Sequence, residues 1–145
     1  MPRLKAAIEI DAPREHVFAI AGDLTKRPQW TTFVKEVTLS AGDGKGVGTK
    51  DRMIAKIGPR PNRWDGEITE YRPGEVLARK FSGYFVGEER ITLTPSGNGT
   101  VVEWRVNYTP PFGLIGKIGA FLLMARVYQN ELEGSLENLK AELEV

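Results

Sequence analysis

The chain has no cysteine and a single histidine among its 145 residues. The absence of cysteine excludes disulfides, thiolate metal ligands and cysteine nucleophiles. With one histidine, only carboxylates are plentiful enough to ligate a metal. The sequence contains no EF-hand or HExxH spacing, no Walker loop and no Ser-His-Asp arrangement with an interpretable spacing. We therefore expect no metal site and no cofactor.

Long apolar runs are also missing. A helix that spans a bilayer needs roughly 18 consecutive apolar residues, and Lys117 interrupts the best candidate. The first residues, Met1-Pro2-Arg3, lead directly into an alternating pattern without an apolar signal segment. These features predict a cytoplasmic protein, present as a monomer or a small homo-oligomer.

Neither sign of charge is in excess. Twenty Lys and Arg face nineteen Asp and Glu, for a net charge of +1. This balance lacks the basic excess typical of nucleic-acid binding, so we expect no nucleic-acid partner. A hydrophobic content of 41% and a charged content of 27% are typical of an ordinary globular chain. The length predicts one domain, residues 1–145.

Alternation of apolar and polar residues predicts seven strands. They cover about residues 3–10, 34–40, 47–57, 63–72, 76–81, 84–94 and 102–108. Turns rich in Gly and Pro separate the last six, and no helical crossover interrupts them, which predicts an antiparallel meander. Between the first two strands, residues 14–22 and 23–33 are each predicted to form a short helix.

The C-terminal part predicts one long helix. Apolar residues recur at steps of three and four from residue 114 to residue 143. The first part, Phe112–Val127, is apolar nearly all round, which predicts enclosure on more than one side. The last part has a narrow apolar stripe opposite a charged face. The predicted fold is α+β, with a curved antiparallel sheet of about seven strands wrapped around this helix.

Short motifs spread along nearly the whole chain resemble those of the START-like (SRPBCC) superfamily of helix-grip proteins, which includes polyketide cyclases/dehydrases and lipid-transport proteins. They are Ile8 to Phe18, Pro28-Gln29-Trp30, Glu70-Tyr71-x-Pro73 and the segment from Leu93 through Gly97 and Gly99 to Trp104. These motifs mark the fold, and none is a catalytic signature. The resemblance implies a hydrophobic ligand cavity between the sheet and the long helix, and it leaves the ligand open.

Large apolar side chains are predicted to point into this interior and to bind the ligand. They are Trp30, Phe33, Met53, Trp64, Phe81, Phe85, Trp104, Phe121 and Leu122. The alternative is that the same residues pack as a solid core. An empty apolar cavity of ~300 Å³ would cost on the order of 7 kcal/mol. A large cavity must therefore be occupied, hydrated or partly collapsed.

Three polar residues are candidates for catalysis: Glu89, Arg52 and Tyr108. By strict alternation Glu89 lies on the apolar side of its strand, where a carboxylate is paired or has a raised pKa, as in a general acid or base. The competing and commoner explanation is a structural pair with Arg52, Arg79 or another cation. The hydroxyl of Tyr108 suits the orientation of a ligand carbonyl or hydroxyl.

Three functions are compatible with these features. The first is the binding or transport of a hydrophobic small molecule such as a lipid, a quinone or a polyketide. The second is a cyclase or dehydratase that uses Glu89, Arg52 or a tyrosine. The third is a protein-interaction module, or a peripheral membrane contact through residues 112–123. The first function needs no chemical role for residues whose chemistry is unassigned, so it is our working hypothesis.

Overall fold

The computed structural model describes residues 2–110 and 117–144. Its elements, in chain order, are β1 (Arg3–Ile10), α1 (Arg14–Ala21), the 3-10 helix η1 (Leu24–Lys26), α2 (Arg27–Trp30), β2 (Val34–Ala41), β3 (Lys50–Ala55), β4 (Asn62–Arg72), β5 (Val76–Gly83), β6 (Val86–Ser96), β7 (Gly99–Thr109) and α3 (Ile118–Leu143). The seven strands form one sheet in the order β1-β7-β6-β5-β4-β3-β2, and every neighbouring pair is antiparallel. The predicted α+β class and meander are confirmed.

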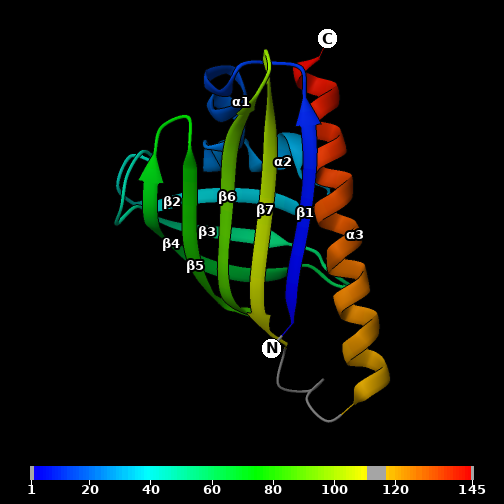
Figure 1. The fold of residues 1–145 in the computed structure, drawn as a ribbon. Helices are drawn as coiled ribbons and strands as arrows, with labels where there is room; N and C mark the ends of the chain where they lie inside the picture. Colours follow the sequence, from blue (N-terminus) through cyan, green and yellow to red (C-terminus); the bar gives the residue numbers. More distant parts are fainter. Residues whose placement is uncertain (1, 111–116, 145) are drawn as a thin grey trace.

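The sheet is strongly bent around its contents. In Figure 1, β1, β7 and β6 run alongside α3, whereas β2 and β3 run crosswise behind these three strands. The buried side chains of α3 are Tyr128, Leu132, Ser135, Leu136 and Leu139. These positions follow the helical period, so one stripe of the C-terminal part of α3 covers the inner face of the sheet. This is the predicted helix-grip arrangement.

The first part of α3 differs from the prediction. Lys117 has non-helical backbone angles, φ −108° and ψ 86°, so α3 begins at Ile118 and not near residue 112. No side chain from Ile118 to Val127 is fully buried. The predicted enclosure of this segment is therefore wrong for residues 118–127, and residues 112–116 of the prediction lie outside the described part of the chain. In Figure 1 the beginning of α3 extends past the end of the sheet, which explains its exposure.

Candidate functional site

An aromatic cluster fills the space between the inner face of the sheet and α3. Its rings are Trp30, Phe33, Trp64, Phe81, Phe85, Trp104, Tyr108 and Tyr128, and none is more than 3% exposed. Neighbouring centroids lie 5.1 to 6.3 Å apart, which is the range of attractive aromatic pairs. The predicted inward orientation is confirmed for the six of these residues that we named as ligand contacts, and also for Met53, which is 1% exposed. Because the rings contact one another, this part of the interior is packed.

The two predicted ligand contacts on α3 lie differently. Phe121 is half-buried, and Leu122 is 62% exposed, so the predicted inward orientation of Leu122 is wrong. The cause is the extension of α3 beyond the sheet, which leaves this turn of the helix without a covering strand. A hollow of about 320 Å³ lies here, lined by Lys117, Ile118, Phe121 and Leu122. A ligand-binding role for these two residues stays a prediction.

Three polar groups within the aromatic cluster lack a partner. The indole Nε1–H groups of Trp30 and Trp64 and the hydroxyl of Tyr108 are buried and form no hydrogen bond with the described residues. The rings of Trp64 and Tyr108 both contact Phe85 and Tyr128, at centroid distances of 5.1 to 6.0 Å. Burial raises the pKa of Tyr108 to about 12, so its hydroxyl is a neutral donor at pH 7. A buried donor without an acceptor costs about 1–3 kcal/mol, so this part of the cluster is short of hydrogen-bond acceptors.

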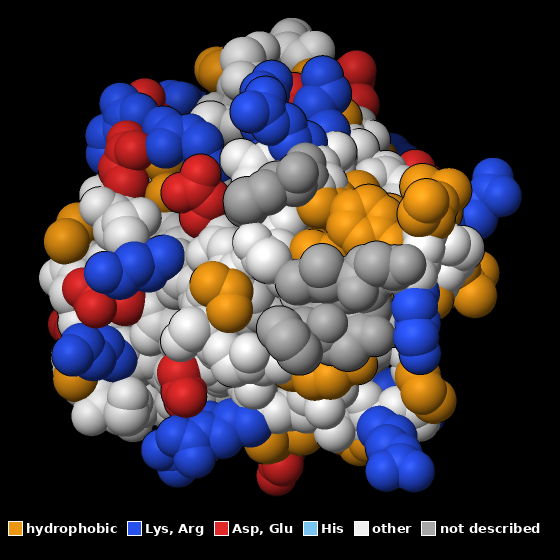
Figure 2. Space-filling model, turned by 90° about the horizontal axis from the view of Figure 1, so that it is seen from below, with side chains coloured by type: hydrophobic (Ala, Val, Ile, Leu, Met, Phe, Trp, Pro, Cys, Tyr) orange, Lys and Arg blue, Asp and Glu red, His pale blue; other side chains and the backbone are white. Residues whose placement is uncertain are grey.

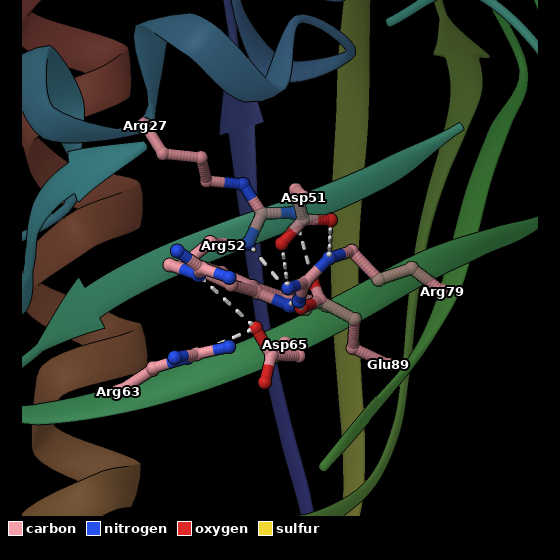
Figure 3. A network of polar contacts seen from close by, with 8 residues as sticks. Arg27, Asp51, Arg52, Arg63, Asp65, Arg79 and Glu89 are labelled. Atoms are coloured by element: carbon pink, nitrogen blue, oxygen red, sulfur yellow. Dashed lines mark hydrogen bonds and ion pairs between the residues drawn. The ribbon is translucent and has the colours of Figure 1, made fainter. Parts of the chain in front are cut away.

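A network of four buried charges lies beside the cluster. The guanidinium of Arg79 donates to Asp51 at 2.6 and 2.9 Å and to Glu89 at 2.5 Å. Arg27 donates to the same Glu89 carboxylate at 2.7 and 3.3 Å, as Figure 3 shows. Trp104 adds an Nε1–H bond to Glu89 at 3.2 Å. Two cations and two anions therefore neutralise one another inside the protein.

Local features of four strands and one helix position this network. Asp51 alternates with Met53 on the inner side of β3, and Glu89 pairs directly with Arg79 in the register of β5 and β6. A β-carbon on Gly66 of β4 would lie 2.2 Å from Nη2 of Arg79, so only glycine leaves room for the guanidinium there. Arg27 begins α2, and its guanidinium lies 5.1 Å from the ring centroid of Trp104.

The predicted inner position of Glu89 is confirmed, and the structural pair is the explanation that holds. Burial alone would raise the pKa of Glu89, but the charges of Arg27 and Arg79 outweigh it and lower the pKa to about 2. A general acid or base works best with a pKa near the operating pH, so a carboxylate this acidic is a poor one. Its charge instead balances the two arginines.

Arg52 lies apart from the other two catalytic candidates. It points to the outer face of the sheet, is about half exposed, and pairs with Asp65 at 3.6 Å. Glu89 and Tyr108 are on the inner face, so the structure does not bring the three residues together. Arg27 and Asp51 were missed in the sequence. Strict alternation with Met53 was a usable signal for Asp51, whereas Arg27 lies in a polar stretch that carried none.

The outer face of the sheet has a hollow of its own, of about 710 Å³. Its rim includes Lys50, Glu67, Lys80, Glu88 and Asn107, which lie next to one another across β3 to β7 in register. Charges of both signs line it, and Lys80 pairs with Glu67 at 4.0 Å. This hollow lies on the face of the sheet away from α3, so the inner aromatic cluster, between the sheet and α3, is the candidate site that matches the predicted ligand position.

Two kinds of feature are absent from the described part of the chain. Residues 2–110 and 117–144 hold no group of three or more His, Cys, Asp or Glu side chains able to bind a metal ion together. Over the same ranges, none of the helices combines the length and the apolar character needed to cross a bilayer.

The sequence model of one protein family, described as "Polyketide cyclase / dehydrase and lipid transport", matches residues 1–144. Among curated proteins, "Toxin Rv0910" of Mycobacterium tuberculosis strain H37Rv is 28% identical over 142 residues, which cover 95% of each chain. "Toxin MT0934" from strain CDC 1551 of the same species matches equally well, at 28% identity.

Solved structures share the fold over the whole chain. TTHA0849 from Thermus thermophilus superposes with a TM-score of 0.83 at 24% identity, covering 98% of this chain and 97% of its own. A START superfamily protein from Mycobacterium smegmatis gives 0.71 at 17% identity, with 98% and 97% covered. The Aha1 protein from Colwellia psychrerythraea, solved as a dimer, gives 0.69 at 16% identity, with 100% and 98% covered. At these identities the likeness concerns the fold alone.

Proposed function

Because the chain belongs to the polyketide cyclase / dehydrase and lipid transport family, we propose that it binds a hydrophobic small molecule between the sheet and α3. The family and the fold are those of hydrophobic ligand-binding domains. The observation that carries the proposal is a pair of unpartnered donors on either side of Phe85, Trp64 Nε1–H and Tyr108 O–H, in a cluster whose third unpartnered donor is Trp30 Nε1–H. Such a site suits a ligand that is mostly apolar and has a carbonyl oxygen.

The packed rings decide how such a ligand would bind. Phe85 lies in the β5–β6 turn and contacts Trp64, Tyr108 and Tyr128, so it closes the cluster at the end where α3 begins. A bound ligand must move some of these rings apart, and contacts between the ligand and the rings then replace the contacts between the rings. A site that closes when empty avoids the free-energy cost of a large void. The ligand would form its hydrogen bonds with the unpartnered donors of Trp64 and Tyr108.

Quinones, polyketide ketones and fatty acyl esters all combine an oily body with carbonyl acceptors, and we propose this class of ligand. An enzymatic role receives less support, because Glu89 is held as a carboxylate by two arginines and Arg52 lies on the other face. The cytoplasmic location and the oligomeric state stay predictions.

Removal of the Tyr108 hydroxyl tests the proposal. We expect Tyr108→Phe to weaken binding of menadione, a naphthoquinone, about tenfold, which corresponds to one lost hydrogen bond of about 1.4 kcal/mol. Binding of 2-methylnaphthalene, which has a similar shape and no carbonyl, should not change. Isothermal titration calorimetry on the purified protein measures both affinities.

The matched control is Tyr84→Phe, which removes the same group from a neighbouring tyrosine that is 37% exposed. This control should leave both affinities unchanged. The free Tyr108→Phe protein should be as stable as the wild type or slightly more so, because the lost hydroxyl has no partner. Equal affinity of wild type and Tyr108→Phe for menadione, or no preference of the wild type for menadione over the hydrocarbon, would count against the proposed site. Native mass spectrometry that finds no small molecule on freshly purified protein would count against it independently.

A second candidate function comes from the curated relatives, which are named as toxins and match over 95% of this chain. We propose that induced expression of this chain in a mycobacterial host slows growth. An allele with an early stop codon, expressed from the same promoter, serves as the control. Unchanged growth at confirmed soluble expression would remove this candidate and leave the ligand-binding proposal as it stands.

A further inference from the structure

Charge is distributed unevenly between the two ends of the molecule. Four described segments, residues 2–3, 56–63, 83–86 and 117–127, meet at the end where α3 begins, and we name this end the α3-start surface. The amide of Tyr84 donates to the carbonyl of Arg63 and joins two of them, and the carbonyl of Pro2 accepts from the amide of Tyr108 in β7, the strand whose Thr109 pairs with Val86. A β-carbon on Gly58 would lie 3.3 Å from Met124 of α3, so the β3–β4 loop also reaches the helix.

The α3-start surface is exclusively cationic. Its four segments contain six basic residues and no acid, namely Arg3, Lys56, Arg60, Arg63, Lys117 and Arg126. All six are exposed. Arg63 pairs with Asp65, the next acid along β4, and the other five form no ion pair with any described residue. The rest of the chain has 14 basic residues and all 19 acids, so a nearly neutral protein is strongly polarised.

Exposed apolar side chains gather on the same surface. Six large hydrophobic residues within the described ranges are exposed, and five of them belong to these segments: Tyr84, Val86, Ile118, Leu122 and Leu123. The three on α3 are 76%, 62% and 63% exposed, in that order. Figure 2 looks onto this end and shows apolar side chains gathered there, with Lys and Arg side chains and some Asp and Glu side chains around them.

From this combination we propose that the α3-start surface docks on an anionic lipid bilayer. Lys and Arg near an anionic membrane are attracted to its headgroups, and aliphatic side chains gain by entering the boundary with the acyl chains. A nucleic acid would meet the cations but would offer the aliphatic residues no apolar environment. The contact is peripheral, with the beginning of α3 lying in the interface.

The inference rests on the proposed function, because it supplies a route for the ligand. The β5–β6 turn belongs to the α3-start surface and holds both exposed Tyr84 and buried Phe85, whose rings lie 5.2 Å apart. Phe85 in turn contacts Trp64 and Tyr108, which carry two of the cluster's three unpartnered donors. A bilayer against this turn therefore lies one ring away from the site. An oily molecule would pass between membrane and protein without crossing water.

Vesicle flotation of the full chain tests the docking. We expect at least tenfold more protein to float with vesicles of 30% phosphatidylserine in phosphatidylcholine than with phosphatidylcholine alone, and the difference to shrink when salt is raised from about 0.1 to 0.5 M. Lys117→Glu with Leu123→Asp should abolish flotation. The matched control applies the same two changes in the β2–β3 loop, as Lys45→Glu with Val47→Asp, and should float like the wild type.

The outcomes separate the two proposals. All these positions are exposed, so each variant should melt at the wild-type temperature and bind menadione with unchanged affinity in solution. The docking proposal is wrong if the wild-type protein does not float with the anionic vesicles, or if the α3 variant floats as well as the wild type. In either case, the menadione titrations still test the ligand-binding proposal separately. A concentration-dependent dimer in size-exclusion chromatography that the α3 variant loses, without flotation, would assign the surface to a second copy and likewise overturn it.

Discussion

Replacement of Glu89 by Gln is expected to lower the free energy of unfolding at pH 7 by about 3–5 kcal/mol. The amide keeps the shape of the side chain but removes its charge. Arg27 and Arg79, each 1% exposed, are then left with the single carboxylate of Asp51, so the interior gains an unbalanced positive charge. Urea denaturation of the two proteins measures the difference.

The neighbouring Glu88→Gln is the control, because Glu88 lies on the outer face of the same strand and is exposed. This change should alter the unfolding free energy by no more than about 0.5 kcal/mol. If Glu89→Gln lowers the unfolding free energy by less than about 1 kcal/mol, the two buried arginines do not need the Glu89 carboxylate to balance their charge.

The same contacts make stability depend on pH. The folded-state pKa of Glu89, about 2, lies below the ordinary value of 4.5 because two arginines outweigh the effect of burial. A lowered pKa contributes stability that is fully present above pH 4.5 and disappears as the pH falls towards 2. We expect the Glu89→Gln protein to lose about 3 kcal/mol less than the wild type over this interval. Parallel loss in both proteins would show that other carboxylates cause the acid sensitivity.

The second large effect is expected for Gly66→Ala, which should cost about 3 kcal/mol of unfolding free energy. The new methyl group would lie 2.2 Å from Nη2 and 2.6 Å from Cζ of Arg79. A free arginine would swing aside at little cost, but this guanidinium is held by Asp51 and Glu89 on two sides. Moving it breaks buried, charged hydrogen bonds. Denaturant unfolding measures the loss.

Gly119→Ala is the control for the same chemical change. A β-carbon there would meet no atom of the described residues within 4 Å, and the residue is in the first turn of α3, so alanine should be neutral or stabilise by up to about 1 kcal/mol. Because Gly66 acts through Arg79, its effect should be smaller in a Glu89→Gln background than in the wild type. Strict additivity would mean that the methyl group acts on something other than the ion network.

Strand alternation predicted much of the interior correctly. It placed Glu89 among inward-facing residues of β6, and the structure has it there, because a regular strand with no bulge at Gly87 leaves no alternative. The same rule applied to Asp51 would have found a second member of the network. Strand alternation cannot predict the position of Arg27, because this residue lies in α2, a helix of four residues whose contacts are set by tertiary packing.

Periodicity was less informative for the long helix. The apolar steps from residue 114 onward predicted helix correctly from Ile118, but they assumed that an apolar face must be enclosed. Leu122 shows why this inference was wrong: hydrophobic side chains also occur on exposed surfaces that bind partners. Similarly, the pattern that points Trp64 and Phe85 inward cannot distinguish rings that contact one another from rings that line a cavity. That distinction depends on the bend of the sheet.

The buried quartet of Asp51, Arg79, Glu89 and Arg27 has a consequence for selectivity. Every positive charge in this interior already has a negative counterpart, so electroneutrality is satisfied before any guest arrives. A free fatty acid would bring an uncompensated carboxylate out of water, whereas an ester or a quinone would bring none. Under the proposed function, we therefore expect the protein to bind the esterified form of an aliphatic chain more tightly than its ionised form.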